Sequence, residues 1–279
     1  MAYQIRPLSF GEILDRSLRV VLDNALLLIP IAAVIYIPLN LLFKIGPRFA
    51  TLVLLLMFVA FPLVQAAMAT AIAEIYLDRP VSIDRAYRSG WAIYLPFLGT
   101  YLLLYLILFG VMLALGLSIG LIGGYAGATA GTGKPPVVIL ILLVIVAVPL
   151  VSYFTVRWSL IGPIMVVESK FGTTALGRSG ALVKGVWWRT LGIMVAAGLI
   201  VEVPVAVLNM IWHSIPLLGS ILTGLASSVA WAYSHTVVVV YYFDRRCRVE
   251  DFDLLRLAEQ IRSESPAGAQ APSGASTIG

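Results

Sequence analysis

Long apolar runs separated by short polar connections dominate the sequence. A helix needs about 20 mostly apolar residues to cross the hydrocarbon core of a membrane. Prolines interrupt several of these runs without ending them, because neighbouring helices can satisfy the carbonyls that a proline frees. The pattern therefore predicts an all-α bundle of six transmembrane helices, at residues 24–43, 50–73, 95–122, 137–167, 190–211 and 217–243.

A shorter amphipathic segment precedes the first of these runs. In residues 9–24, Ser9 and Glu12 have the spacing of a capping box at the start of a helix. Polar residues follow on one side of this helix, and apolar residues recur at helical spacing on the other. The expected apolar stripe consists of Phe10, Ile13, Leu14, Leu18 and Val21.

Similar segments precede the third and fifth runs. Residues 81–96 begin with Ser82 as a good N-cap, and the glycine-rich segment 173–192 places Leu176, Val183 and Trp187 at helical spacing. We expect three repeat units, each an interfacial helix on the cytoplasmic face followed by two spans. A simpler alternative is that any chain entering a membrane carries Arg and Trp at the interface. Each segment contains an Arg-Ser pair, namely Arg16-Ser17, Arg88-Ser89 and Arg178-Ser179.

The composition restricts the class of protein. Hydrophobic residues make up 60% of the chain and charged residues only 12%, whereas soluble domains contain about 25% charged residues. The mean hydropathy is +0.98. These values indicate an integral membrane protein and exclude a soluble enzyme, a disordered regulator, a collagen-like fibre and a nucleic-acid-binding module. The single cysteine, Cys247, excludes an internal disulfide.

Basic residues predict the orientation. Fifteen lysines and arginines fall in the termini and alternate loops on one side of the six spans, against Lys44, Arg48 and Lys134 on the other. Loops rich in Lys and Arg stay in the cytoplasm. Both termini are therefore expected there, and the net charge of +5 is a topology signal and gives no reason to expect nucleic-acid binding.

Three connecting or terminal segments carry weaker expectations. The glycine-rich residues 123–133 are expected to form an insertion on the non-cytoplasmic side. Residues 251–262 predict a brief amphipathic helix. Residues 263–279 are short, polar and poor in apolar residues, and are expected to form a disordered cytoplasmic tail.

No motif in the chain predicts catalysis, a cofactor or a metal site. The sequence GTGKPP resembles a phosphate-binding loop, but Ala128 and Pro135 stand where that motif needs a glycine and a hydroxyl residue. His213, His235 and Cys247 do not have the spacing of metal ligands. His235 is instead expected to be a packing residue among aromatic side chains. We therefore expect no enzymatic activity.

Two charged residues lie well inside predicted spans. Arg157 is eleven residues before Glu168, at the cytoplasmic end of the fourth span, and Glu202 is twelve residues after Thr190, at the cytoplasmic start of the fifth. At 1.5 Å per residue both lie roughly 17 Å deep. Charges at such depth usually pair, so we expect an Arg157–Glu202 ion pair, either structural or at the centre of a substrate path. Alternatively, Pro163 breaks the fourth span, so that Arg157 extends to the cytoplasmic interface and Glu202 is protonated.

Basic residues near the amphipathic segments have two interpretations. They could bind anionic lipid headgroups, at about 1 kcal/mol per basic residue. The simpler interpretation is that they only determine topology. The residues concerned are Arg85, Arg88, Arg178, Lys184 and Arg189.

The second half of the chain resembles a known family. The segments ESKFGTTALGRSGALVKGVWWRTLGIMV and VVVVYYFDRRCRVEDFDLL are similar to the membrane domain of glycerophosphoryl diester phosphodiesterase, and RPLSFGEILDRSLRV is similar to the start of its actinobacterial members. In the proteins that name this family, a separate soluble barrel carries the phosphodiester chemistry. Only seventeen residues follow Arg262 here. The resemblance therefore implies a polytopic helical domain without the enzymatic activity.

Two functions remain as expectations from the sequence. The first is a non-enzymatic scaffold or accessory subunit of a membrane complex, motivated by short loops and by small residues four apart that favour close helix packing. The alternative is a transporter or lipid-handling protein that uses the Arg157/Glu202 pair. The expected partners are the bilayer, anionic lipids, and a membrane protein or a second copy. The excess of Arg over Lys and the Ala/Gly/Val bias indicate a GC-rich bacterium and its inner membrane.

Overall fold

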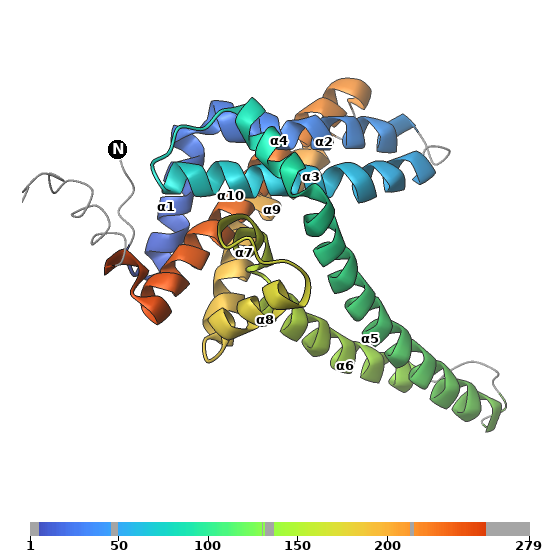
Figure 1. Ribbon diagram of the computed structural model, residues 1–279. Coiled ribbons are helices and arrows are strands. Elements are labelled where there is room, and N and C mark those ends of the chain that lie inside the picture. The colour runs from blue at the N-terminus through green and yellow to red at the C-terminus, as the bar shows by residue number, and fades with distance from the viewer. Residues whose placement is uncertain (1–5, 46–49, 130, 132–136, 213–214, 255–279) are drawn as a thin grey trace, which may run out of the picture.

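The computed structural model describes residues 6–45, 50–129, 131, 137–212 and 215–254, and this part of the chain contains ten helices and no strand (Figure 1). The predicted tail 263–279 lies outside the described residues, as does most of the predicted helix 251–262. The helices are α1 (Phe10–Asp23), α2 (Ala25–Ile45), α3 (Ala50–Tyr76), α4 (Ile83–Ala92), α5 (Tyr94–Thr129), α6 (Val137–Arg157), α7 (Ile161–Val167), α8 (Gly172–Val183), α9 (Trp187–Trp212) and α10 (Pro216–Glu250).

The described residues contain six candidate membrane spans, in the places where the apolar runs predict them. They are Ala25–Leu42, Thr51–Tyr76, Tyr94–Thr129, Val144–Val167, Trp187–Trp212 and Leu217–Glu250. Two boundaries differ from the prediction. The third span continues as helix to Thr129, so the expected glycine-rich insertion begins later than residue 123, and part of that segment lies outside the described residues. The fourth span is not one continuous helix.

The break in the fourth span lies between α6 and α7. Helix α6 ends at Arg157, and α7 begins at Ile161 with Pro163 near its start. The hydroxyl of Ser179, in α8, donates to the carbonyl of Arg157 (2.9 Å) and accepts from the N–H of Leu160 (3.3 Å). One side chain thus satisfies backbone groups on both sides of the break, which would otherwise be costly to bury.

The chain consists of three units that each contain a short helix and two long segments. The units are α1–α2–α3, α4–α5 with α6 and α7, and α8–α9–α10. Each unit ends just before a non-glycine residue with positive φ: Asp78 (59°), Ser169 (51°) and Asp251 (50°). These are the only such residues in the described part of the chain. A left-handed residue is a common way to end a helix, and its recurrence at equivalent points supports the repeat.

The three units pack in a closed cycle. Each short helix contacts the last helix of the preceding unit: α4 contacts α3, α8 contacts α7, and α1 contacts α10 of the last unit. The long helices follow the same rule, since α5 contacts α3, α9 contacts α6, and α2 contacts α10. The chain therefore closes on itself with an approximate threefold pattern. Leu8, the ends of α3 and α10, Glu168 after α7, and helix α8 are joined by hydrogen bonds, ion pairs and a ring contact, and we call this region the charged end.

When α1 and α4 are aligned by their capping serines, their buried residues fall at equivalent positions. The Arg-Ser pairs give a different alignment of these two helices. Ser9 and Ser82 both cap their helices, as predicted. Counting from these caps, the buried residues Ile13 and Ser17 of α1 correspond to the buried residues Ala86 and Gly90 of α4. The pair Arg88-Ser89 is therefore displaced by one position from Arg16-Ser17. In α8, the Arg-Ser register does match, because Ala175 and Ser179 are buried at the equivalent positions.

The apolar stripe predicted for α1 is divided between the core and the surface, and the one predicted for α8 is corrected. In α1, Ile13 and Val21 are buried, but Phe10 and Leu18 are 41% and 44% exposed. Helix α8 ends at Val183, so Trp187 does not belong to it and instead begins α9. An amphipathic sequence defines an apolar sector of a helix, but which part of that sector contacts the bundle depends on where neighbouring helices lie.

The hairpin of α5 and α6 projects away from the remaining helices (Figure 1). We call it the arm. From Tyr105 to Ile122 no residue of α5 is buried. The core instead lies at the charged end, where α3, α7 and α10 meet and where the rings of Tyr76 and Phe243 stack with centroids 5.0 Å apart. The break between α6 and α7 makes this arrangement possible, since α7 stays in the core while α6 diverges from it.

Candidate functional site

The charged end contains a buried carboxylate that joins three segments. The side chain of Asp244, in α10, is completely buried. Its Oδ1 accepts from the backbone N–H of Leu8 (2.7 Å) and from Nε of Arg248 (2.9 Å). Its Oδ2 lies 3.4 Å from Nη2 of Arg189, without the geometry of a hydrogen bond. Both arginines also donate to the carbonyl of Leu8. The cluster fixes the N-terminal segment against α9 and α10.

A second carboxylate, Glu168, joins the end of α7 to α8 and α10. It accepts from Arg178 (2.9 Å), Lys170 (2.7 Å) and the hydroxyl of Tyr242 (3.0 Å). Burial by itself raises the pKa of Glu168, but these donors outweigh burial and the net effect lowers the pKa. Arg178 also pairs with Glu250. The desolvation of Arg178 is likewise outweighed by its carboxylate partners, so its pKa is raised.

These clusters account for two of the five residues considered for lipid binding. Arg178 and Arg189 are bound to carboxylates within the chain, so their charges are already compensated. Arg88 forms an exposed ion pair with Asp84 one turn away, and Arg85 donates to the carbonyl of Pro80. Lys184 is exposed.

The structure does not bring Arg157 and Glu202 together, although it describes both. Nη1 of Arg157 donates to the hydroxyl of Tyr153 (2.9 Å). Its guanidinium lies against α8, so close that a methyl group on Gly180 would be 3.1 Å from Nε. Arg157 therefore lies at the level of α8, near the charged end. The expectation of equal depth assumed an unbroken fourth span, and the break after Arg157 removes that assumption.

Glu202 lies on another side of the bundle. It is exposed on α9 and close enough to Tyr36 of α2 for the two to interact electrostatically. Seven residues further along α9, about two turns, Asn209 accepts from Thr223 of α10 (3.2 Å). Tyr36, Glu202, Asn209 and Thr223 all lie within candidate membrane spans. No hydrogen bond or ion pair of Glu202 occurs within the described residues.

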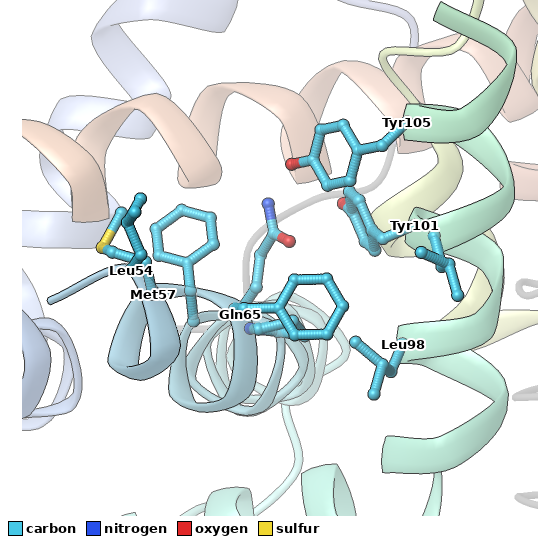
Figure 2. A pocket seen from close by; sticks show the side chains of 10 residues that line it. Leu54, Met57, Gln65, Leu98, Tyr101 and Tyr105 are labelled. Atoms are coloured by element: carbon cyan, nitrogen blue, oxygen red, sulfur yellow. The ribbon is translucent and has the colours of Figure 1, made fainter. Parts of the chain in front are cut away.

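A cavity of about 280 Å³ lies between α3 and α5, at the root of the arm (Figure 2). Most of its lining is apolar, and Gln65, Tyr101 and Tyr105 supply the polar groups. The other lining residues are Leu54, Met57, Phe58, Phe61, Pro62, Leu98 and Leu102. An apolar cavity with a few convergent polar groups is the usual form of a small-molecule site. It is therefore the best candidate for ligand binding in the described part of the molecule.

The cavity adjoins a polar contact inside the bundle. The amide nitrogen of Gln65 lies 3.4 Å from Nε2 of His235, and Nδ1 of His235 lies 3.0 Å from the carbonyl of Trp231. The ring of His235 also lies over that of Trp231, with centroids 3.9 Å apart. His235 thus packs among aromatic residues, while its second nitrogen positions Gln65. No group of three or more potential metal ligands occurs within the described residues.

Sequence reasoning did not identify the residues of this cavity. Tyr101 and Tyr105 lie in an apolar run that contains other aromatic residues, so nothing distinguishes them. Gln65 could have been noticed in the sequence, since it is the only amide or charged side chain between residues 50 and 73. Polar residues within spans usually face the bundle interior or a cavity. That rule would have selected Gln65 without the structure.

A comparison with known protein families identifies the family of this chain. Residues 45–263 match the family described as "Domain of unknown function (DUF8558)", which is well over half of the sequence. The chain belongs to the DUF8558 family. The match runs from the end of α2 through α10 and therefore includes the arm and the cavity. No curated protein and no solved structure matches this DUF8558 chain.

Proposed function

We propose that this DUF8558 protein is a non-enzymatic accessory subunit of a bacterial inner-membrane complex, and that its arm binds a transmembrane helix of another membrane protein. The observation that carries the proposal is the arm itself. In α5, eighteen consecutive residues from Tyr105 to Ile122 have no buried member, and α6 diverges from the core together with α5. Two long helices that leave their own bundle present a large surface for another helix.

The surface of the arm suits helix packing. Gly116, Gly120 and Gly124 lie four apart on α5, and no atom of the described residues would contact a methyl group on any of them. Small residues at this spacing let a second backbone approach closely. By contrast, Gly224, which lies between Ser220 and Ser228 at the same spacing on α10, is already packed, since a methyl group there would lie 2.9 Å from Cα of Ile37. The pattern on α10 is therefore used within the chain, whereas no described residue packs on the three glycines of α5.

The length of α5 supports a tilted arm. A helix of 36 residues is about 54 Å long, whereas the hydrocarbon core is about 30 Å thick. A helix that exceeds the core tilts or extends beyond it, and either would separate the outer part of the arm from the other spans. Lipid alone could surround such a hairpin, but a partner helix would bury more of its small-residue face.

We further propose that the charged end faces the cytoplasm and that α1, α4 and α8 lie at the membrane surface there. Fifteen basic residues at this side of the predicted spans support the orientation. In α1, the exposed apolar row of Phe10, Leu18 and Leu22 lies beside the polar face, as expected for a helix in the interface. Because Arg178 and Arg189 are paired internally, contact with anionic lipids would rest on Arg85, Arg88 and Lys184.

The resemblance to the membrane domain of glycerophosphoryl diester phosphodiesterase remains part of this proposal. It suggests a helical membrane module that can be joined to different partners. The segments that carry it contain Glu168, Arg178 and Asp244, which organise the charged end. The resemblance therefore concerns the architecture of the bundle and carries no enzymatic activity to this chain.

The function is tested by cross-linking from the arm in living cells. A photoreactive phenylalanine at Leu117, which is 60% exposed on α5, should give a discrete adduct with another membrane protein. The matched control is Leu26, which is 93% exposed on α2 outside the arm. Adducts from Leu117 but not from Leu26 support the proposal. Adducts with a second copy would show instead that the arm forms a homo-oligomer, and adducts with lipid only would contradict partner binding.

Orientation is tested separately. Lys184→Cys in a Cys247→Ser background should react with an impermeant thiol reagent only after cells are permeabilised, whereas Ala128→Cys at the outer end of α5 should react in intact cells. Native Cys247 cannot serve as the reporter, because it is buried. The reverse labelling pattern would invert the proposed topology.

The alternative, transport or lipid handling, no longer rests on an Arg157/Glu202 pair, because the two residues do not meet, although prolines still interrupt several spans. A different observation now favours it, namely the cavity between α3 and α5. Its lining indicates what kind of molecule it could hold.

A further inference from the structure

The cavity between α3 and α5 contains a hydroxyl group without a hydrogen bond in the described part of the chain. Tyr101 is 9% exposed, and its hydroxyl forms no hydrogen bond within the described residues. The ring is held from one side by Phe97, with centroids 5.1 Å apart, and lies beside the ring of Tyr105. In Figure 2 the hydroxyls of Tyr101 and Tyr105 both point from α5 toward α3, into the cavity. In a cavity lined mostly by apolar residues, a ligand group that can bond this hydroxyl is favoured over one that cannot.

The amide of Gln65 faces the same space from α3 (Figure 2). The carbonyl oxygen of Trp231 can only accept a hydrogen bond. Nδ1 of a neutral His235 therefore carries the ring proton and donates to this oxygen. Nε2 of His235 is then an acceptor, and the amide nitrogen of Gln65 donates to it. This assignment leaves Oε1 of Gln65 as an acceptor without a partner. The cavity thus presents one acceptor from α3 and two hydroxyls from α5.

The remaining lining determines which ligands are excluded. All seven other lining residues are apolar, and none of the ten carries a charge. A carboxylate, phosphate or ammonium group would have no counter-ion there and would pay a large desolvation cost. Both walls are candidate membrane spans, and Leu54, Leu102 and Tyr105 at the cavity are more than 40% exposed, so the cavity is open toward the surrounding bilayer.

We propose that this cavity binds an uncharged lipid that carries a hydroxyl group, such as a long-chain alcohol. The chain of the lipid lies along Phe58, Leu98 and Leu102. Its hydroxyl lies between α3 and α5, where it donates to Oε1 of Gln65 and accepts from the hydroxyl of Tyr101. A hydroxyl satisfies both groups at once, whereas an alkane satisfies neither. The inference deepens the lipid-handling alternative and does not depend on a partner at the outer part of the arm.

The site is tested by photolabelling of the purified full-length protein in detergent. The probe is hexadecanol with a photoreactive diazirine in its chain, and the controls are the matching alkane and the matching carboxylate. We expect saturable labelling of peptides from α3 and α5 by the alcohol and much weaker labelling by both controls. Equal labelling by the alkane would show a non-specific apolar groove, and equal or stronger labelling by the carboxylate would contradict an uncharged ligand.

Two substitutions test the assigned contacts. Tyr101→Phe and Gln65→Leu should each raise the probe concentration needed for half-saturation by about five-fold, the effect of one lost hydrogen bond. Tyr125→Phe is the matched control, because Tyr125 lies on the same helix, outside the cavity, and is 75% exposed. Thermal unfolding of each variant establishes that it is folded, and Tyr105→Phe replaces any variant that is not. Unchanged labelling in the cavity variants would overturn the site even if cross-linking from the arm succeeds.

Discussion

Oδ1 of Asp244, near the end of α10, accepts a hydrogen bond of 2.7 Å from the backbone N–H of Leu8, which lies 236 positions earlier in the chain. Arg189 and Arg248 complete the contact from the other side, since both donate to the carbonyl of Leu8. The bond connects the first repeat unit to the last. It therefore closes the cycle in which α1 contacts α10, while α4 and α8 contact the units that precede them.

Replacing Asp244 by Asn should strongly destabilise the protein. The amide can still accept from Leu8, but Arg189 and Arg248 lose the negative charge that they face. Removing one member of a buried ion pair costs roughly 3–5 kcal/mol. The measurement is the free energy of unfolding in detergent, with Asp84→Asn as the control for an exposed pair, where the cost is within about 1 kcal/mol. Equal stabilities of the two variants would contradict a structural role for Asp244.

Stability should decrease in acid because of Glu168. Its folded-state pKa is lowered from 4.5, so its contribution is present above pH 4.5 and is lost as the pH falls through the folded-state pKa. Glu168→Gln should therefore be less stable than the wild type near neutral pH, and the difference should shrink as the pH falls below 4.5 and through the lowered folded-state pKa. Chemical unfolding over this pH range measures it. A difference that is constant with pH would show that the charge of Glu168 contributes nothing.

Arg157 and Glu202 should behave independently. The guanidinium of Arg157 contacts Tyr153 and α8, and Glu202 lies near Tyr36, so the two share no partner. In a double-mutant cycle with Arg157→Met and Glu202→Gln, the losses in stability should add to within about 0.5 kcal/mol. Recovery of stability in the double variant would instead indicate an ion pair between them.

The contact between α4 and α3 depends on a glycine. A methyl group on Gly90 would lie 3.0 Å from the backbone nitrogen of Ala67, which cannot move independently. Gly90→Ala should destabilise the protein by about 1–3 kcal/mol through overpacking. Gly177, in α8, has open space around it, so Gly177→Ala should stabilise its helix by about 0.5–1 kcal/mol. Thermal unfolding of the two variants should give shifts of opposite sign, and a shared direction would contradict the close approach at Gly90.

The exposed apolar row of α1 should contact lipid. A spin label at Leu18→Cys should be reached more readily by oxygen dissolved in the bilayer than by a water-soluble nickel complex. A label at Arg19→Cys, on the polar face of the same helix, should show the opposite preference. Both variants are made in a Cys247→Ser background and reconstituted in vesicles. The same aqueous accessibility at both positions would show that α1 does not lie in the interface.

Much of the fold could be predicted because it depends on local composition. The apolar runs locate the six candidate spans, and the serines before α1 and α4 locate the starts of these helices. The sequence predicted a continuous fourth span and gave the break after Arg157 only as an alternative. Part of the cause of the break lies in another segment of the chain. Pro163 alone would have allowed a kink, but the hydroxyl of Ser179 satisfies the separated ends of α6 and α7 and permits a full break.

The candidate site could be predicted less well than the fold. The sequence singled out Arg157 and Glu202 because a charge inside a membrane span is costly. It does not show which residues lie beside them. It did not single out Tyr101 or Tyr105, because a tyrosine in an apolar run gains significance only when the fold places its hydroxyl at a cavity. The contact of Asp244 with Leu8 also could not be read from the sequence, since its donor is a backbone N–H rather than a side chain.

The sequence by itself determined that this chain is a helical membrane protein with three pairs of long apolar segments, because hydrophobic length and helical periodicity are local properties. The tertiary structure alone decided how these segments meet. It placed α1 on α10, released the arm from the core and aligned Gln65 with Tyr101 across a cavity. Every span is apolar on most of its surface, so hydrophobicity cannot specify which faces touch. That choice depends on close contacts at small residues and on a few polar groups that must find partners where water is absent.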